Sequence, residues 1–153
     1  MSDKKARKYQ RITEQIKSLF KTTNDPIARM ATISAILYHK MPDFFWVGFY
    51  LLKNDRLIVG PYQGSLACQE LEKDKGVCWT AIRRKETIIV PDVNKFPGYI
   101  ACNQKTKSEI VIPVKNSNNK IIGAFDIDSK LYNNFDETDA VELGKIVANL
   151  NMK

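Results

Sequence analysis

The sequence predicts an α+β fold: a central, mainly antiparallel sheet of about six strands, with N- and C-terminal helices on one face and a loop-covered pocket on the other. Apolar residues recur at helical spacing near both ends, aromatic and β-branched runs fill the middle, and short polar turns separate those runs. The 153 residues suit a single domain, 1–153, because they suffice for one hydrophobic core and are few for two. Its expected parts are the N-terminal helices (1–40), the sheet with a site loop (41–130) and the C-terminal helix (131–153).

Three long helices are expected at the two ends. Apolar positions follow helical spacing from about Lys4 to Thr22, where "TTNDP" interrupts the pattern. Pro26 opens a second helix that runs to about Lys40, since proline is favoured in the first helical turn. At the other end, "FDETDAVELGKIVANL" is amphipathic and offers an N-terminal cap near Asp136.

The middle of the chain predicts six strands. The runs "FFWVGFYLL" and "RLIVGPY" form a hairpin across "KND", and "EIVIPVK" and "KIIGAFDIDS" form another across "NSNN". We also expect a third strand in "GSLACQELE" and a short one in "TIIV", with a short helix between them that begins near Gly76 or Val77. Two of the three cysteines would then lie on this third strand and on the short helix.

Residues 91–108 read as a long loop, because they hold two prolines, a glycine and no periodicity. A loop of this length inside a compact domain is usually functional. We expect it, with the short helix, to cover the sheet face that the terminal helices leave open, and a pocket to form there.

Composition and charge narrow the class of protein. The formal net charge is +7, and residues 1–25, with seven basic and three acidic residues, account for +4 of it. A solvated basic helix explains this, and no nucleic-acid-binding motif accompanies it. No apolar run approaches the roughly 20 residues of a membrane span, and the N-terminus lacks a secretory signal. We therefore expect a cytoplasmic protein that binds neither nucleic acid nor membrane.

The three cysteines, Cys68, Cys78 and Cys102, are odd in number and occur without an export signal, which argues against a structural disulfide framework. Their spacing, C-x9-C-x23-C, fits no zinc motif, and the single histidine, His39, lies far upstream, so we expect no metal. A lone cysteine is most often a small core residue. Because all three lie on elements expected around the open sheet face, redox chemistry is the alternative.

A group of acids is predicted beside these cysteines. Asp126 and Asp128 share one face of a strand, since side chains alternate, and Glu109 begins the hairpin partner. Gathered carboxylates raise one another's pKa in a desolvated pocket, which suits a ligand with an ammonium group and an oxygen that needs a proton. The plainer interpretation is that Asp128 begins a turn and that Glu109 is a solvated strand end. Taken singly, Trp46 and Tyr62 are also more typical of packing than of a pocket wall.

The segments "WVGFYLL", "LIVGPYQGSLAC", "GVCWTAI", "VPDVNKFPGYIAC", "SEIVIPV" and "IIGAFDIDS" together resemble the free methionine-(R)-sulfoxide reductases, a family of single GAF domains. The resemblance runs from Trp46 to Leu150 and includes the spacing of all three cysteines. It implies a GAF fold, reduction of free L-methionine-(R)-sulfoxide to methionine without a cofactor, thioredoxin as the reductant, and a homodimer.

The same resemblance implies roles for the thiols. Cys102, in "YIAC", matches the nucleophile that takes up the sulfoxide oxygen as a sulfenic acid. Cys68 matches the resolving thiol, whose disulfide with Cys102 thioredoxin reduces, and Cys78 matches a third family cysteine that is an alternative resolver or a substrate contact. Lys105 and Lys107 could lower the Cys102 pKa if they approach it.

The resemblance also implies roles for the acidic and aromatic residues of the expected site. Glu109, Asp126 and Asp128 match an acidic triad, in which we assign protonation of the sulfoxide oxygen to Asp128 or Glu109 and ammonium binding mainly to Asp126. Trp46 and Tyr62 match aromatic positions that pack on the methyl and thioether groups.

Two residues depart from the family pattern, and one rival class fits the fold. Trp79 stands where the family usually has a small residue, and its bulk could change how the short helix packs over the pocket and so the role of Cys78. Asn103 stands where aspartate is common. The rival is a non-catalytic GAF sensor that binds a small molecule. It would bind its ligand without turning it over.

Overall fold

The computed structural model describes residues 2–151 and confirms the α+β class with a six-stranded sheet. The strand order is β3-β2-β1-β6-β5-β4, and every neighbouring pair is antiparallel. The elements are α1 (Ser2–Leu19), α2 (Pro26–Lys40), β1 (Phe44–Lys53), β2 (Arg56–Gly64), β3 (Glu70–Leu71), α3 (Gly76–Arg84), β4 (Ile88–Val90), the 3-10 turn η1 (Val93–Lys95), β5 (Ser108–Lys115), β6 (Ile121–Ser129) and α4 (Glu137–Ala148). Met1, Met152 and Lys153, which the predicted division includes, lie outside the described residues.

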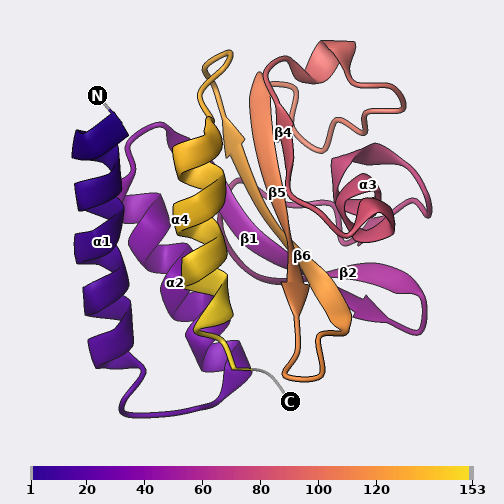
Figure 1. Ribbon diagram of the computed structural model, residues 1–153. Coiled ribbons are helices and arrows are strands. Elements are labelled where there is room, and N and C mark those ends of the chain that lie inside the picture. Colours follow the sequence, from indigo (N-terminus) through magenta and orange to yellow (C-terminus); the bar gives the residue numbers. More distant parts are fainter. Residues whose placement is uncertain (1, 152–153) are drawn as a thin grey trace.

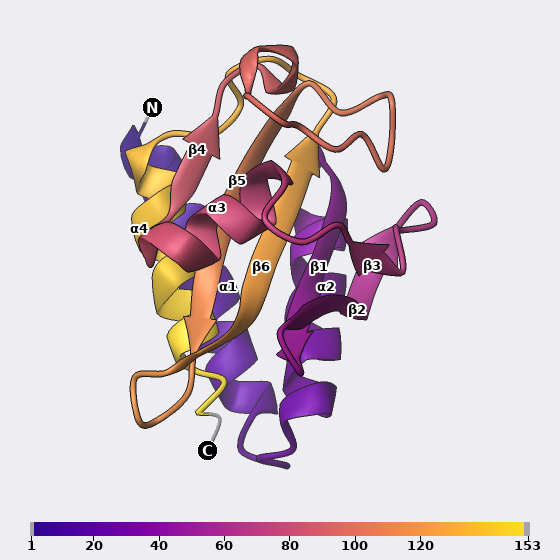
Figure 2. The ribbon, with the colours of Figure 1, turned by 90° about the vertical axis from the view of Figure 1, so that its right-hand side faces the viewer.

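The three long helices α1, α2 and α4 lie together on one face of the sheet, and the short helix α3 lies alone on the other (Figures 1 and 2). The predicted helix starts are confirmed. The Asp25 carboxylate accepts from the Ala28 amide ahead of Pro26, and Asp136 and Asp139 form a reciprocal capping box at α4. No helix within residues 2–151 is both long enough and apolar enough to cross a membrane.

The two predicted hairpins form the centre of the sheet. Asn54 and Asp55 join β1 to β2 with φ angles of 51° and 61°, the left-handed conformation that two-residue hairpin turns require and that Asn and Asp tolerate. At the β5–β6 turn the Asn116 side chain accepts from the amides of Asn118 and Lys120. The β5–β6 register places Glu109 opposite Asp128, as the strand pattern predicts.

The main hydrophobic core lies between the sheet and the long helices. Phe49 of β1 stacks on Phe125 of β6 with ring centres 4.5 Å apart, and both side chains are fully buried. Ile110 and Ile127 extend this layer under the helices. Because alternate strand residues face opposite sides, the residues between these apolar ones face α3 and the loops.

The predicted third strand is largely wrong. Of "GSLACQELE", only Glu70 and Leu71 pair with β2, and residues 65–69 form a loop (Figure 2). The reason is that β1 side chains bond backbone groups in this loop: the Trp46 indole N–H donates to the carbonyl of Ser65, and the Tyr50 hydroxyl donates to the carbonyl of Cys68. Because these two carbonyls accept hydrogen bonds from side chains, they are not paired with a neighbouring strand, and Cys68 lies on a loop.

The long loop after β4 begins with the short η1 turn, which the sequence pattern did not indicate. Asp92 caps it by accepting from the Asn94 amide. The Val93 amide donates to the carbonyl of Lys107, and the Lys107 amide donates to the carbonyl of Ser129, so both ends of the loop are fixed to the sheet. Residues 96–106 extend between these attachments above the open face (Figure 2).

Candidate active site

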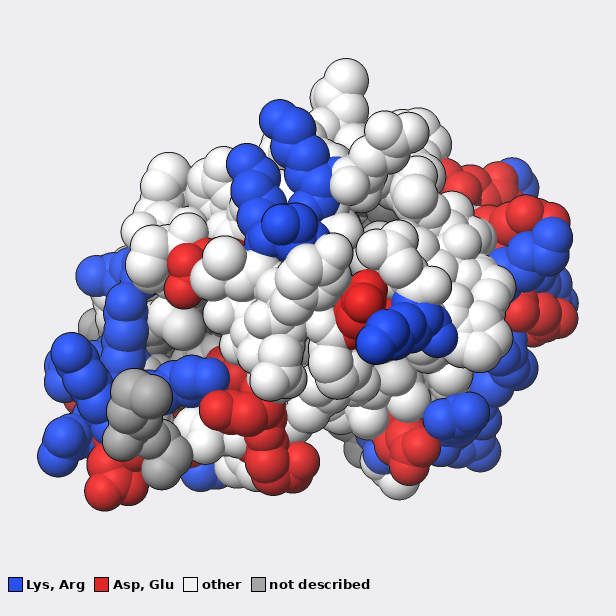
Figure 3. Space-filling model, turned by 90° about the horizontal axis from the view of Figure 1, so that it is seen from above, with Lys and Arg blue, Asp and Glu red and all other residues white. Residues whose placement is uncertain are grey.

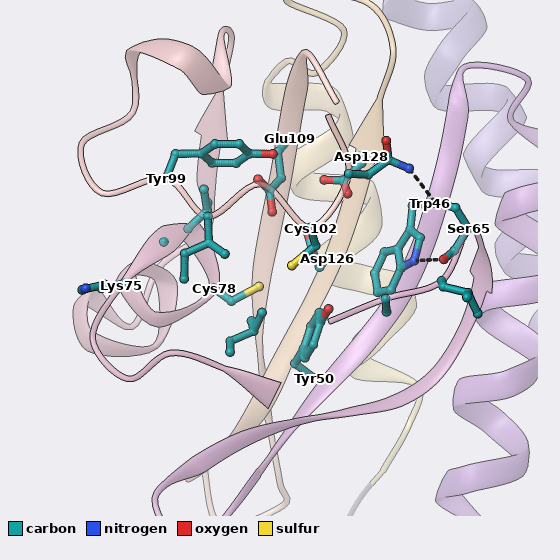
Figure 4. A pocket seen from close by; sticks show the side chains of 17 residues that line it. Trp46, Tyr50, Ser65, Lys75, Cys78, Tyr99, Cys102, Glu109, Asp126 and Asp128 are labelled. Carbon is teal, nitrogen blue, oxygen red and sulfur yellow. Dashed lines mark hydrogen bonds between the residues drawn. The ribbon is translucent and has the colours of Figure 1, made fainter. Parts of the chain in front are cut away.

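A cavity of about 40 Å³ lies between the open sheet face, the start of α3 and the two loops (Figure 4). It brings together most of the predicted site residues. They come from β1 (Trp46), α3 (Cys78), the long loop (Cys102), β5 (Glu109) and β6 (Asp126 and Asp128). The remaining lining residues are Tyr50, Ser65, Leu66, Ala67, Leu71, Lys75, Gly76, Val77, Tyr99, Ile100 and Asn103.

The three acids line this cavity because the β5–β6 register places Glu109 opposite Asp128 and Val111 opposite Asp126. Glu109 and Asp126 are only 5% and 6% exposed, and Asp128 is partly buried. The plainer interpretation, a solvated strand end and a turn residue, is therefore wrong for their placement.

Burial and mutual repulsion change the acids' proton affinities. Burial raises the pKa of Asp126 to about 6, although hydrogen bonds with Glu109 and Cys78 pull it the other way. Burial, followed by the charges of Asp126 and Asp128, raises the pKa of Glu109 well above its ordinary value, and burial and Asp126 do the same to the pKa of Asp128. The cluster therefore holds protons near neutral pH and can donate them.

Two carboxylate oxygens in this cluster have no hydrogen-bond partner among the described residues. They are Oδ1 of Asp126 and Oδ1 of Asp128, and both are buried. Buried polar atoms in folded proteins are normally paired, so such acceptors in a cavity indicate a ligand that donates hydrogen bonds or carries positive charge.

Cys68 and Cys102 form a disulfide that joins the loop before β3 to the long loop, with their Cα atoms 5.6 Å apart. Cys78, at 3% exposure, is a free thiol on α3. Burial and the charge of Asp126 raise its pKa well above the ordinary value, so this thiol stays protonated and is a weak nucleophile. The disulfide therefore joins Cys68 and Cys102, the two cysteines that the resemblance pairs.

Lys105 and Lys107, which could act on Cys102 only if they approached it, do not line the cavity. Lys107 instead lies over the ring of Tyr132, with its Nζ 5.1 Å from the ring centre. The two lysines give no support to the suggested lowering of the Cys102 pKa.

Of the two aromatic residues expected to line the pocket, Trp46 and Tyr62, only the first does so. Tyr62 instead stacks on the Trp46 ring with centres 5.3 Å apart. Gly48 makes room for this stack, because a Cβ there would lie 2.3 Å from the Tyr62 Cβ and 2.7 Å from the Trp46 ring. The position facing the cavity is Tyr50, whose ring centre is 5.8 Å from that of Trp46.

Sequence reasoning missed Tyr50 and Tyr99, both of which line the cavity. Tyr50 could have been found, since residues 46, 48 and 50 alternate onto one strand face. Tyr99 lies in the aperiodic loop, where no such signal exists. Burial raises the pKa of both phenols, with Asp126 the next cause for Tyr50 and Glu109 for Tyr99, so both hydroxyls stay protonated.

The structure shows where Trp79 and Asn103, the two departures from the family pattern, lie relative to the cavity. The Trp79 side chain is buried away from the cavity, and its indole N–H donates to the carbonyl of Leu71 at 3.4 Å, so Cys78 still faces the cavity. Asn103 lines the cavity, and its side-chain amide donates to the Ser65 hydroxyl at 2.7 Å (Figure 4). Asn103 therefore ties the Cys102 loop to the Cys68 loop.

The start of α3 lines the same cavity, and the first backbone N–H groups of a helix have no partner within the helix. Lys75 precedes the helix without a side-chain capping bond, and Gly76 and Val77 line the cavity. Free N–H groups and the helix dipole favour an anion at such a terminus. The start of α3 and the three acids thus line the same small cavity.

The side chains of the cavity are poorly suited to bind a metal ion. Cys78, Glu109 and Asp126 do place ligand atoms within 4.8 Å of one another. Metal ligands must be deprotonated, however, and all three groups have raised pKa values. Their proton-holding state suits acid catalysis better.

On the face seen in Figure 3, the described residues form no continuous basic groove. Basic and acidic side chains are interspersed on the face seen in Figure 3. Lys5 of the basic helix α1 is paired with Asp136 and Asp139 of α4. The excess positive charge is therefore partly neutralised by the neighbouring helix.

The fold and the site define a GAF domain with thiols and carboxylates on its open face, and a family model described as "GAF domain" matches residues 30–150. The free methionine-R-sulfoxide reductase of Escherichia coli (strain K12) is 43% identical over 81% of this chain and 74% of that protein. The enzyme of that name from Saccharomyces cerevisiae is 42% identical over 82% and 73%. The chain belongs to the free methionine-R-sulfoxide reductase family.

Structural comparison agrees with this. The X-ray structure of the free methionine-R-sulfoxide reductase from Neisseria meningitidis, in complex with its substrate, superposes with a TM-score of 0.91 and 39% identity. The match covers 96% of this chain and 88% of that one. The two chains therefore share the fold almost end to end, and the family is an enzyme family.

Proposed function

We propose that this protein reduces free L-methionine-(R)-sulfoxide to L-methionine. The observation that carries the proposal is the single cavity that contains Cys102 together with Glu109, Asp126 and Asp128. It combines the sulfur that becomes a nucleophile once the disulfide is reduced with acids that hold protons at neutral pH. The names of the relatives in E. coli and yeast support the same substrate.

The cavity walls account for recognition of a free amino acid. The unpaired oxygens of Asp126 and Asp128 accept hydrogen bonds from the α-ammonium group. The amides at the start of α3 receive the α-carboxylate. The Trp46 ring packs on the methyl and thioether portion. A methionine sulfoxide within a peptide lacks both charged groups and would leave the buried acids unpaired.

The first chemical step transfers oxygen from substrate to protein. The Cys102 thiolate attacks the sulfoxide sulfur, while Glu109 or Asp128 protonates the sulfoxide oxygen, which is otherwise a poor leaving group. The oxygen ends on Cys102 as a sulfenic acid, and methionine leaves. The substrate sulfur is reduced by two electrons and the Cys102 sulfur is oxidised by two.

The second step regenerates the protein. Cys68 attacks the sulfenic acid, water leaves, and the Cys68–Cys102 disulfide forms. A dithiol reductant of the thioredoxin class then reduces this disulfide. In the disulfide-bonded form Cys102 has no free thiol, so this reduction must precede the next attack on substrate. The homodimer stays a prediction from the resemblance.

A coupled assay tests the proposal. Reduced protein is given free methionine-(R)-sulfoxide, thioredoxin, thioredoxin reductase and NADPH, and NADPH oxidation is followed. We expect turnover, with kcat/KM at least about 100-fold lower for N-acetylmethionine-(R)-sulfoxide, because acetylation removes the ammonium charge. Binding of the free sulfoxide without NADPH oxidation would favour the sensor alternative instead.

A further inference from the structure

The loop of residues 65–69, here called the Cys68 loop, is held in place by side chains of β1. Its backbone enters the sheet only at its end, where the Val59 amide donates to the carbonyl of Gln69. Before that point, the Trp46 indole N–H donates to the carbonyl of Ser65 at 3.0 Å, and the Tyr50 hydroxyl donates to the carbonyl of Cys68 at 3.2 Å. The second bond reaches the residue that carries the reacting sulfur.

Tyr50 is well suited to fix that carbonyl. Its side chain is 2% exposed and lies on a central strand, with the ring stacked on Trp46 at an interplanar angle of 20°. Burial and the nearby Asp126 keep its pKa above the ordinary range, so the hydroxyl remains a donor at any physiological pH. A rigid ring on a strand positions a hydrogen bond more narrowly than a residue on a loop does.

A second bond sets the Cys68 loop against its partner loop. The Asn103 side-chain amide donates to the Ser65 hydroxyl, and Asn103 directly follows Cys102. The Cys68 loop is therefore held both by side chains of β1 and by the loop that bears Cys102; the two bonds to Ser65 are drawn in Figure 4.

We propose that Tyr50 is a positioning residue for disulfide closure: its hydroxyl holds the Cys68 carbonyl so that the Cys68 sulfur meets Cys102. The inference rests on the proposed roles of these two cysteines. In the step concerned, the Cys68 thiolate attacks the Cys102 sulfenic sulfur. An S–S bond forms, the S–O bond breaks, and the oxygen leaves as water after taking up a proton. Holding the reacting groups together raises their effective concentration.

The test separates closure from the reaction with sulfoxide. Hydrogen peroxide oxidises Cys102 of the reduced protein to the sulfenic acid directly, and the reaction is quenched with an alkylating agent to count remaining thiols by mass spectrometry. Dimedone traps any sulfenic acid that has not closed. The variant is Tyr50→Phe, which retains the ring and removes the hydroxyl. Its matched control is Tyr62→Phe, which removes a hydroxyl from the other tyrosine stacked on Trp46.

We expect closure about fivefold slower in Tyr50→Phe, the effect of losing one hydrogen bond, with more dimedone adduct and with the peroxide step unchanged. Tyr62→Phe should close at the wild-type rate. A general weakening of the fold would instead lower the thermal midpoint of the reduced variant and slow both steps.

Equal closure rates in Tyr50→Phe and wild type, or equal slowing in the two variants, would overturn the inference. Failure of the wild type to close the pair would remove the cysteine roles on which it rests. A protein that closes normally after peroxide but does not reduce methionine sulfoxide would refute the proposed substrate, and the Tyr50 effect on closure would still support the positioning role.

Discussion

The two faces of the β5–β6 hairpin differ sharply although they alternate along the same strands. On the helix-covered face the residues are apolar and at most 4% exposed: Ile110, Ile112, Phe125 and Ile127. On the other face the same strands bury Glu109 and Asp126. One face lowers the free energy of the fold by burying apolar surface, and the other gives up stability to hold reactive groups.

The two faces also differ in whether their buried groups have partners within the protein. Phe125 is fully packed against Phe49, whereas Asp126 has a buried oxygen without a partner and a raised pKa. Such unpaired groups are costly in the folded state and useful once a ligand pairs them. Substitutions on the two faces should therefore have opposite effects on stability and activity.

The largest effect is expected at the proposed nucleophile on the cavity side. Cys102→Ser should lower turnover of free methionine-(R)-sulfoxide by at least about 1000-fold, because it removes the attacking sulfur. In the NADPH-coupled assay this variant should stay near background, while its thermal midpoint under reducing conditions stays close to that of the wild type. Substantial remaining turnover would assign the chemistry to another thiol.

On the helix side, Phe125→Ala should lower the free energy of unfolding by about 3–5 kcal/mol, because it leaves a cavity in the core. Denaturant unfolding of the reduced protein measures this. Any fraction that remains folded should keep its activity per molecule, since Phe125 does not line the cavity. A loss of activity much greater than the loss of folded protein would show that the faces are coupled.

Asp126→Asn should show the opposite pattern. It should lower kcat/KM by about 100-fold, because the ammonium group loses a buried charged partner. It should also raise the free energy of unfolding at pH 8 by on the order of 1 kcal/mol, since a desolvated charge is removed. A destabilised variant would mean that Asp126 is better satisfied than the structure indicates.

The smallest expected effect is the dependence of stability on pH. Since burial raises the Asp126 pKa from 3.8 to about 6, the folded state binds more protons than the unfolded state between these values. The free energy of unfolding of the reduced protein should therefore fall as pH rises from about 4 through 6, and the slope should be shallower in Asp126→Asn. Unfolding curves at several pH values check the sign, and a rise over this interval would contradict it.

Strand periodicity and turn chemistry were sufficient to predict much of the fold and part of the site. The alternation in "FDIDS" placed Asp126 and Asp128 together on one strand face, since that rule depends only on neighbouring residues. The helix start at Pro26 and the cap at Asp136 are likewise local signals.

The errors arose where contacts between distant residues decide the structure. The Cys68 loop resembles a strand by composition, but Tyr50, 18 residues earlier, bonds its backbone. Tyr62 was predicted to be a pocket wall and stacks behind Trp46, because Gly48 leaves space for that stack. Tyr99 faces the cavity because of the path of the long loop, which composition does not specify, whereas Tyr50 follows from the same strand alternation as Trp46 and was simply missed.

The most direct measurement is a thiol count after a single turnover. Reduced protein is mixed with free methionine-(R)-sulfoxide in the absence of any reductant, and released methionine and remaining thiols are quantified. The proposal predicts one methionine per chain and loss of two of the three thiols, and in Cys68→Ser one methionine with a dimedone-reactive Cys102. Methionine release without loss of thiols, or thiol loss without methionine, would contradict it.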